Sequence, residues 1–249
     1  MKHCFSYKYI IFWLCIFGLS TPTLVSAQIT VTDVIMSFKP ESKPVHNVYV
    51  GNSSEEMMYV TAEVAKIERN ENGEEIRHPT TDLLVAPKRF SVKGKDRRTV
   101  RLLLRTRPKE IEATYRISFI PQVTPHEEDN LKKGVNIRMV TGMGMLIFAE
   151  PASPRHTLTW ERNGDKVKLI NTGNTNLKLR ELQFCNLPLS TSKDDVDNSK
   201  DIQCDKYSKA INRLYPNDSV EIVVPKDKSL VLQKDANDEI EKVIIPPSY

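Results

Sequence analysis

The segment 135–151 has the most informative hydrophobic pattern in the chain. Counted at every second position, one set of residues is apolar apart from a single threonine. It comprises Val135, Ile137, Met139, Thr141, Met143, Met145 and Ile147. The other set begins with Asn136 and Arg138 and becomes apolar at Leu146 and Phe148. Because a strand with one face in water alternates apolar and polar residues, this segment predicts a β-strand that is apolar on both faces.

Two interpretations of this strand are open. It is either a central strand of a sandwich, covered by protein on both faces, or a strand that presents one face to a partner. Its three methionines in the apolar set favour the second interpretation, because a flexible thioether side chain adapts to several partner surfaces.

Many other segments are short, alternating and rich in β-branched residues, which predicts further strands. In the first half these are 28–37, 46–50, 57–68, 83–86, 90–92, 98–104 and 114–121. In the second half they are 156–160, 166–171, 177–185, 219–224 and 240–245. Turn sequences such as Asn-Glu-Asn-Gly at 70–73 separate them. No segment has a sustained helical period, so the predicted fold class is all-β.

Pro151 and Pro154 mark a stiff, extended connector after the Met-rich strand. We place a domain boundary there, with one domain over 28–150 and a smaller one over 151–249. The number and spacing of strands predict two immunoglobulin-like β-sandwiches joined by this short proline-containing linker.

Residues 1–27 have the layout of a secretory signal peptide. Lys2 and Lys8 precede an apolar run over 9–19, and small residues lead to Ala27. The run is too short to span a bilayer comfortably, and no later apolar run approaches that length. We therefore expect cleavage after Ala27 and export of a mature chain that does not insert into the membrane.

Cleavage removes two lysines and no acidic residue, which lowers the formal net charge from +4 to about +2. This small excess does not indicate nucleic acid as a partner. Of the four cysteines, only Cys185 and Cys204 remain, and in an exported chain such a pair predicts one disulfide. The alternative is a metal pair, but no histidine lies close enough in sequence to complete a site.

Candidate catalytic residues are few. The five histidines are scattered, and no serine lies in a Gly-x-Ser-x-Gly motif. Gly142 and Gly144 form a Gly-x-Gly, but they lie within a predicted strand and open no helix, so they do not indicate a nucleotide site. Small residues there favour close approach of another backbone or side chain. We expect no enzyme activity, no cofactor and no metal.

Basic residues cluster at Lys93, Lys95, Arg97, Arg98, Arg101, Arg105 and Arg107. Their simplest interpretation is a solvated strand edge and turn. The alternative is that one arginine, held on a strand, receives a partner's carboxylate through a bidentate contact.

Several stretches resemble the PapD-like periplasmic pilus chaperones, and most closely the alternative branch that serves common-pilus and class 5 fimbria-type systems. They are Leu-Leu-Val-Ala-Pro at 83–87, Thr-Val-Arg-Leu at 99–102, Tyr-Arg-Ile-Ser-Phe at 115–119, Leu-Ile-Asn-Thr-Gly-Asn at 169–174, and the pair Cys185 and Cys204. The resemblance covers essentially the whole mature chain.

This resemblance implies donor-strand complementation, in which a chaperone strand completes a pilin subunit's sandwich until an outer-membrane usher exchanges it. It implies a periplasmic, non-enzymatic chaperone with pilin subunits and the usher as partners. The face presented to the subunit would carry Ile137, Met139, Thr141, Met143 and Met145. Val140, Leu146 and Phe148 would then face the chaperone's own core.

One departure from the family concerns the subunit's terminal carboxylate, which many members bind with an arginine in the first strand and a lysine late in the donor strand. Ile35 and Leu146 hold those places here. The candidate replacements are Arg101, Arg116 and Arg138, unless this branch relies on apolar contacts instead. Self-association through the donor strand is a further expectation, and a structural or adhesive protein with two immunoglobulin-like domains is the alternative function.

Overall fold

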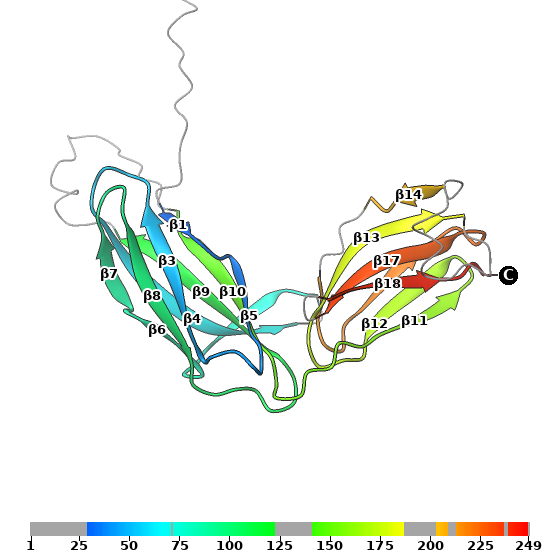
Figure 1. Cartoon of the computed structure of the whole chain (residues 1–249), viewed down its shortest axis with the longest axis horizontal. Helices are drawn as coiled ribbons and strands as arrows, with labels where there is room; N and C mark the ends of the chain where they lie inside the picture. Colours follow the sequence, from blue (N-terminus) through cyan, green and yellow to red (C-terminus); the bar gives the residue numbers. More distant parts are fainter. Residues whose placement is uncertain are drawn as a thin grey trace, which may run out of the picture.

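The computed structural model describes residues 29–70, 72–122, 141–186, 203–208, 213–236 and 239–248. These residues form strands and loops and contain no helix, so none of them forms a helix that would cross a membrane. Figure 1 shows two layered units, one built from β1 to β10 and the other from β11 to β18. The predicted all-β fold with two sandwiches is confirmed, and the connector at Pro151 lies between β10 and β11.

The first unit is a sandwich of two sheets. Its four-stranded sheet has the order β1 (Ile29–Val31), β3 (Val45–Asn52), β8 (Arg97–Leu104) and β6 (Leu83–Ala86). The second sheet has the order β2 (Ile35–Phe38), β10 (Met143–Ala149), β9 (Ala113–Gln122), β4 (Met58–Arg69) and β5 (Glu75–Pro79). Its sixth strand, β7 (Arg89–Val92), also pairs with β4. The two sheets enclose the core.

The core of the first unit follows from alternation along these strands, since every second side chain points inward. Its largest fully buried members include Phe38, Leu102, Tyr115, Ile117, Phe119, Met145 and Ile147. They come from both sheets, so each sheet buries its apolar face against the other.

The first predicted strand, over 28–37, is divided in the structure. β1 pairs with β3 in one sheet, whereas β2 runs parallel to β10 in the other. The chain changes sheets between Val31 and Ile35, and Val34 is more than half exposed in this crossing. A continuous apolar pattern cannot reveal such a crossing, because both halves contribute to the same core.

The second unit is a smaller sandwich. One sheet has the order β11 (Leu158–Asn163), β12 (Lys166–Asn171) and β16 (Ser219–Val223). The other has the order β14 (Cys204–Lys206), β13 (Leu177–Cys185), β17 (Ser229–Ala236) and β18 (Glu239–Ile245), with β15 (Arg213–Leu214) also paired to β13. Val167, Leu169, Leu177, Leu230, Leu232 and Ile245 are fully buried between them.

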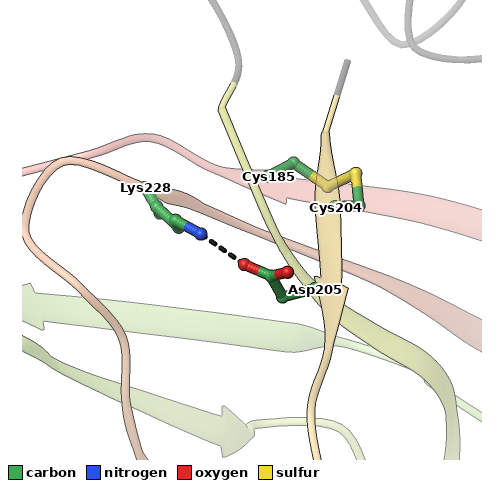
Figure 2. Close-up of a disulfide and its surroundings, with 4 residues drawn as sticks. All are labelled: Cys185, Cys204, Asp205 and Lys228. Carbon is green, nitrogen blue, oxygen red and sulfur yellow. Dashed lines mark hydrogen bonds and ion pairs between the residues drawn. A yellow bond between two sulfur atoms is a disulfide. The ribbon is translucent and has the colours of Figure 1, made fainter.

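The predicted disulfide joins Cys185 to Cys204, 19 residues apart, and is confirmed. Figure 2 shows it linking β13 to the short edge strand β14, beside the ion pair of Lys228 with Asp205. Cys185 is fully buried, whereas Cys204 is exposed. The bridge therefore ties an edge segment with few other contacts to a central strand. The described residues contain no cluster of histidine, cysteine or acidic side chains that would hold a metal ion.

Candidate functional site

The predicted orientation of the Met-rich strand is wrong where the structure describes it. Met145 is fully buried in the core of its own sandwich, and Met143 packs against that core. The reason is the register of β10 with β9, which places Met145 opposite the buried Ile117 and Met143 opposite the buried Phe119. When both faces of a strand are apolar, its sequence alone does not show which face is inward.

The other set of alternate residues in β10, which includes Leu146 and Phe148, belongs to the outer face of the six-stranded sheet. Leu146 is half-buried there and lies in register with Arg116 on β9 and with Ile35 on β2. Phe148 is fully buried, but Tyr215 and Arg213 of the second unit contact its ring instead of the first unit's core. The prediction that Leu146 and Phe148 face their own core is therefore also wrong.

The residues in the same alternate set as Met143 and Met145 become less buried toward the start of β10. Met145 is fully buried, Met143 is half-buried, and Thr141 is exposed. The sandwich core thus ends near Met143. Outside the described residues lie two other predicted donor residues, Ile137 and Met139. Val140, which was predicted to face the chaperone's own core, also lies outside them.

One edge of β10 is open at the start of the strand. β9 pairs with it from Met143 to Ala149, but β2 pairs with it only from Leu146 onward. In addition, the Leu146 amide donates to the Val34 carbonyl at 2.8 Å. Within the described part of the chain, no strand covers the other edge of residues 143–145. Such an edge can bind another strand through its backbone groups.

Beside this edge the outer face lacks a side chain at Gly144 and is partly apolar. Gly144 has no side chain, and a Cβ atom there would lie 3.6 Å from Nη1 of Arg116. Ile35 is 55% exposed, and Tyr59 on the same sheet is 45% exposed. This surface therefore combines unpaired backbone, room for another chain, and apolar side chains that remain accessible.

Arg116 is the predicted anchor that lies on this outer face. Its Nε donates to Oε2 of Glu75 at 2.9 Å, and its Nη2 contacts the other carboxylate oxygen. Arg69 lies 3.7 Å from the same carboxylate. The hydrogen bond from Arg116 lowers the pKa of Glu75, although partial burial acts in the opposite direction. The site therefore already holds a bidentate arginine–carboxylate pair.

Of the other two anchor candidates, the structure describes only Arg101, and it lies on a different surface. Arg101 is exposed on β8, in the four-stranded sheet, opposite Asn47 and Ala86. Arg138 lies outside the described residues. Ile35 and Leu146, which hold the family's usual anchor positions, are direct neighbours across β2 and β10. The structure thus brings Arg116 next to those positions and leaves Arg101 on a different surface.

Aromatic and arginine residues join the two units beside this face. The Arg69 guanidinium lies 4.1 Å above the Tyr215 ring and donates to the Tyr215 hydroxyl at 2.8 Å. Arg213 lies 4.6 Å above the Phe148 ring. The sequence analysis missed this cluster because its members are far apart in the chain and match no local motif.

A buried carboxyl group also lies at this junction. Oε2 of Glu112 accepts a hydrogen bond at 2.7 Å from Nδ2 of Asn176, in the second unit. Its Oε1 is buried and accepts none from the described residues. Burial raises the pKa of Glu112 to about 7, and the nearby Glu150 acts in the same direction while Arg213 opposes it. The contact between the units therefore includes a group that titrates near neutral pH.

Residues 26–154, just over half of the chain, match the family described as pili and flagellar-assembly chaperone, PapD N-terminal domain. Among similar solved structures is the class 5 fimbriae chaperone CfaA, with 20% identity, a TM-score of 0.65, and coverage of 89% of this chain and 99% of that one.

Two further structures show the same fold. The E. coli chaperone DraB has 15% identity and a TM-score of 0.58, with 88% of this chain and 96% of that one covered. A chain of the CsuC–CsuE chaperone–tip adhesion subunit complex of Acinetobacter baumannii has 14% identity and a TM-score of 0.56, with 90% and 100% covered. No curated protein sequence matches at a significant level.

Proposed function

Because this chain belongs to the PapD-type pili and flagellar-assembly chaperones, we propose that it binds pilin subunits in the periplasm by donor-strand complementation and delivers them to an outer-membrane usher. A chaperone role in pilus assembly follows from family membership, and this role involves no catalysis. The CsuC–CsuE complex pairs a relative with a tip adhesion subunit, which supports a pilus subunit as the partner. Residues 1–27 would direct this export and be removed by cleavage after Ala27.

The observation that carries this proposal is the open edge of β10 ahead of Leu146. Its backbone groups supply generic hydrogen bonds to an added strand, and neighbouring side chains supply selectivity. A subunit strand on this edge would lie over Gly144 and beside Leu146 and Ile35. The partner would therefore contact the outer face as well as the edge.

The donated side chains then come from the segment before β10. Met143 and Met145 contribute to the chaperone's own core, so we assign the partner contacts to Ile137 and Met139. Thr141 belongs to the same alternate set and is exposed, so it marks the end of the buried part. Each large apolar side chain buried in a subunit groove would contribute about 1.5–3 kcal/mol before ordering costs.

We assign the carboxylate anchor to Arg116. Its guanidinium holds Glu75 in the geometry that a subunit's terminal carboxylate would need, and Leu146 lies next to it. An incoming carboxylate would exchange with Glu75, which has room to turn toward solvent because its side chain is about one quarter exposed.

Co-expression with the cognate pilin subunit tests the proposal. Replacing Ile137 and Met139 together by arginine should leave the chaperone folded, because the burial of this set of residues has already decreased to a half-buried Met143 and an exposed Thr141. The change should abolish recovery of the chaperone–subunit complex. The matched control replaces the exposed Asn47 and Thr99 by arginine on the other sheet, with the same change in charge. Complex recovery at the wild-type level from the first variant would contradict the proposal, and a two-domain adhesin would not keep the subunit soluble at all.

A further inference from the structure

A cleft opens on the side of the first sandwich away from β10. Strands β5 and β7 both pair with the same edge of β4, β5 from Ala65 onward and β7 up to Thr61. Between them the paired ladder is interrupted, although the Ala62 amide donates to the Lys88 carbonyl at 2.7 Å. The cleft lies at this interruption and has a volume of about 550 Å³.

The floor of the cleft is apolar. Ala62 and Val64 line it from β4, and Leu84 lines it from β6 in the other sheet. Val64 and Leu84 are only partly buried, so the seam between the two sheets is accessible at this point. An apolar side chain from outside would find contacts here that the first unit does not itself fill.

The rim of the cleft is basic. Arg77, Lys88 and Arg89 are exposed around it, and none of them forms an ion pair with any residue in the described parts of the chain. Glu63 is the acidic residue in the lining. Two carboxylates of the adjoining strands already have partners, Glu68 with His78 and Glu75 with Arg116, although Arg77 also helps to lower the pKa of Glu75. The cleft therefore has an excess of positive charge around an apolar floor.

We propose that this cleft is a docking site for an extended acidic segment of a partner protein. An apolar side chain of the segment would cover Val64 and Leu84, and flanking carboxylates would contact Arg77, Lys88 and Arg89. A free phosphate would use the cations but not the apolar floor. A strand-like peptide uses both, because its side chains alternate between the floor and the rim.

This site goes beyond the proposed function. The cleft lies at the opposite edge of the six-stranded sheet from β10, and it meets the outer face at Arg116 and Ser118. A protein bound at the β10 edge would leave the rim at Lys88 and Arg89 open. The cleft is therefore suited to a second partner while a first one is bound.

Titration calorimetry on the full mature chain tests the inference. The probes are the blocked peptide Glu-Leu-Glu-Val-Glu, its counterpart Lys-Leu-Lys-Val-Lys, and tripolyphosphate as an anion without apolar side chains. The test variant carries Arg77→Glu, Lys88→Glu and Arg89→Glu. The control variant carries Lys93→Glu, Arg98→Glu and Arg101→Glu, which are equally exposed but line no part of the cleft. Circular dichroism checks that both variants remain folded.

We expect the acidic probe to bind the wild type and the control, and to bind the test variant about tenfold or more weakly, because three charge contacts are reversed. The basic probe should show the opposite preference. Equal losses in both variants, or equal binding of tripolyphosphate and peptide, would reduce the effect to general attraction of anions and overturn the inference. Absence of binding to the wild type would overturn it as well, without affecting the proposed use of β10.

Discussion

Glu112 connects the chemistry of a single side chain to the contact between the two units. Asn176 donates to its carboxyl group, and the backbone amide of Glu112 donates to the Asn174 carbonyl at 2.9 Å. Since burial raises the pKa of Glu112 to about 7, the folded chain favours the neutral form of this group. The unfolded chain ionises it near the ordinary value of 4.5.

Replacing Glu112 by glutamine should change the pH dependence of stability. The stabilising contribution of a carboxyl with a raised pKa is complete below about pH 4.5 and is lost as the pH rises to about 7. Relative to the wild type, Glu112→Gln should therefore be more stable at pH 8 than at pH 5, by about 1–3 kcal/mol. Urea unfolding at both pH values measures this difference. The exposed Glu110→Gln is the control, and an equal pH effect in both variants would contradict the assignment.

Arg116 is the residue whose proposed role is easiest to isolate. Arg116→Met should weaken binding of the pilin subunit about tenfold or more, because a bidentate contact to a carboxylate is lost. Arg116→Lys should restore part of that loss through charge alone. Arg101→Met, on the other sheet, should leave binding within about twofold of wild type if only positioned charge matters. Subunit pull-down from periplasmic extracts measures the three variants, and a larger effect at Arg101 would reassign the anchor.

At the scale of the element, β10 has two different halves. From Leu146 to Ala149 it is covered on both edges, by β9 and β2, and it ends in the contact with the second unit. From Met143 to Met145, β9 is the only strand among the described residues that pairs with it. The strand is thus anchored at its end and available for pairing at its start, which is what the proposed strand donation requires.

Neighbouring residues of β10 should respond oppositely to truncation. Met145→Ala should lower the free energy of unfolding by about 2–5 kcal/mol, because it leaves a cavity in a fully packed core. Leu146→Ala should cost about 1 kcal/mol or less, since this side chain is only half-buried, but it should reduce recovery of the subunit complex. Denaturant unfolding and pull-down on the same two variants provide the comparison. A larger stability loss at Leu146 would reverse the assignment of the faces.

At the scale of the whole molecule, the two sandwiches are stabilised by different means. The first has the larger core, whereas the second is smaller and its edge strand β14 is tied by the disulfide. Small exported domains commonly depend on such bridges. The connection between the units rests on Asn174 and Asn176 and on the aromatic cluster around Phe148.

Removing the disulfide should therefore destabilise the second unit selectively. Replacing Cys185 and Cys204 by alanine should cost roughly 3 kcal/mol, as expected for a closed loop of this length. Trp160 is the single tryptophan after residue 27 and belongs to β11, so its fluorescence reports on the second unit. Subunit binding through β10 should survive in this variant. Unfolding of both units in a single transition would contradict the prediction that the disulfide stabilises the second unit selectively.

Local patterns in the sequence determined the strands, the all-β class and the disulfide, because period-two alternation and cysteine usage are local signals. The prediction of β4 over 57–68 differs from the structure by one residue at each end. By contrast, β5, β14, β15 and β17 were missed. β5 is mostly polar and exposed, and β14 and β15 have only three and two residues. No strand was predicted over the residues of β17.

Only the tertiary structure decided which face of β10 is buried, where the anchor candidate lies, and which residues meet between the units. An apolar strand is symmetric in sequence, and its inward face is set by register with β9. Arg116 and Glu75, or Glu112 and Asn176, become partners only when distant strands are paired. Such contacts leave no local pattern in the chain, since their energy depends on burial and geometry that arise after folding.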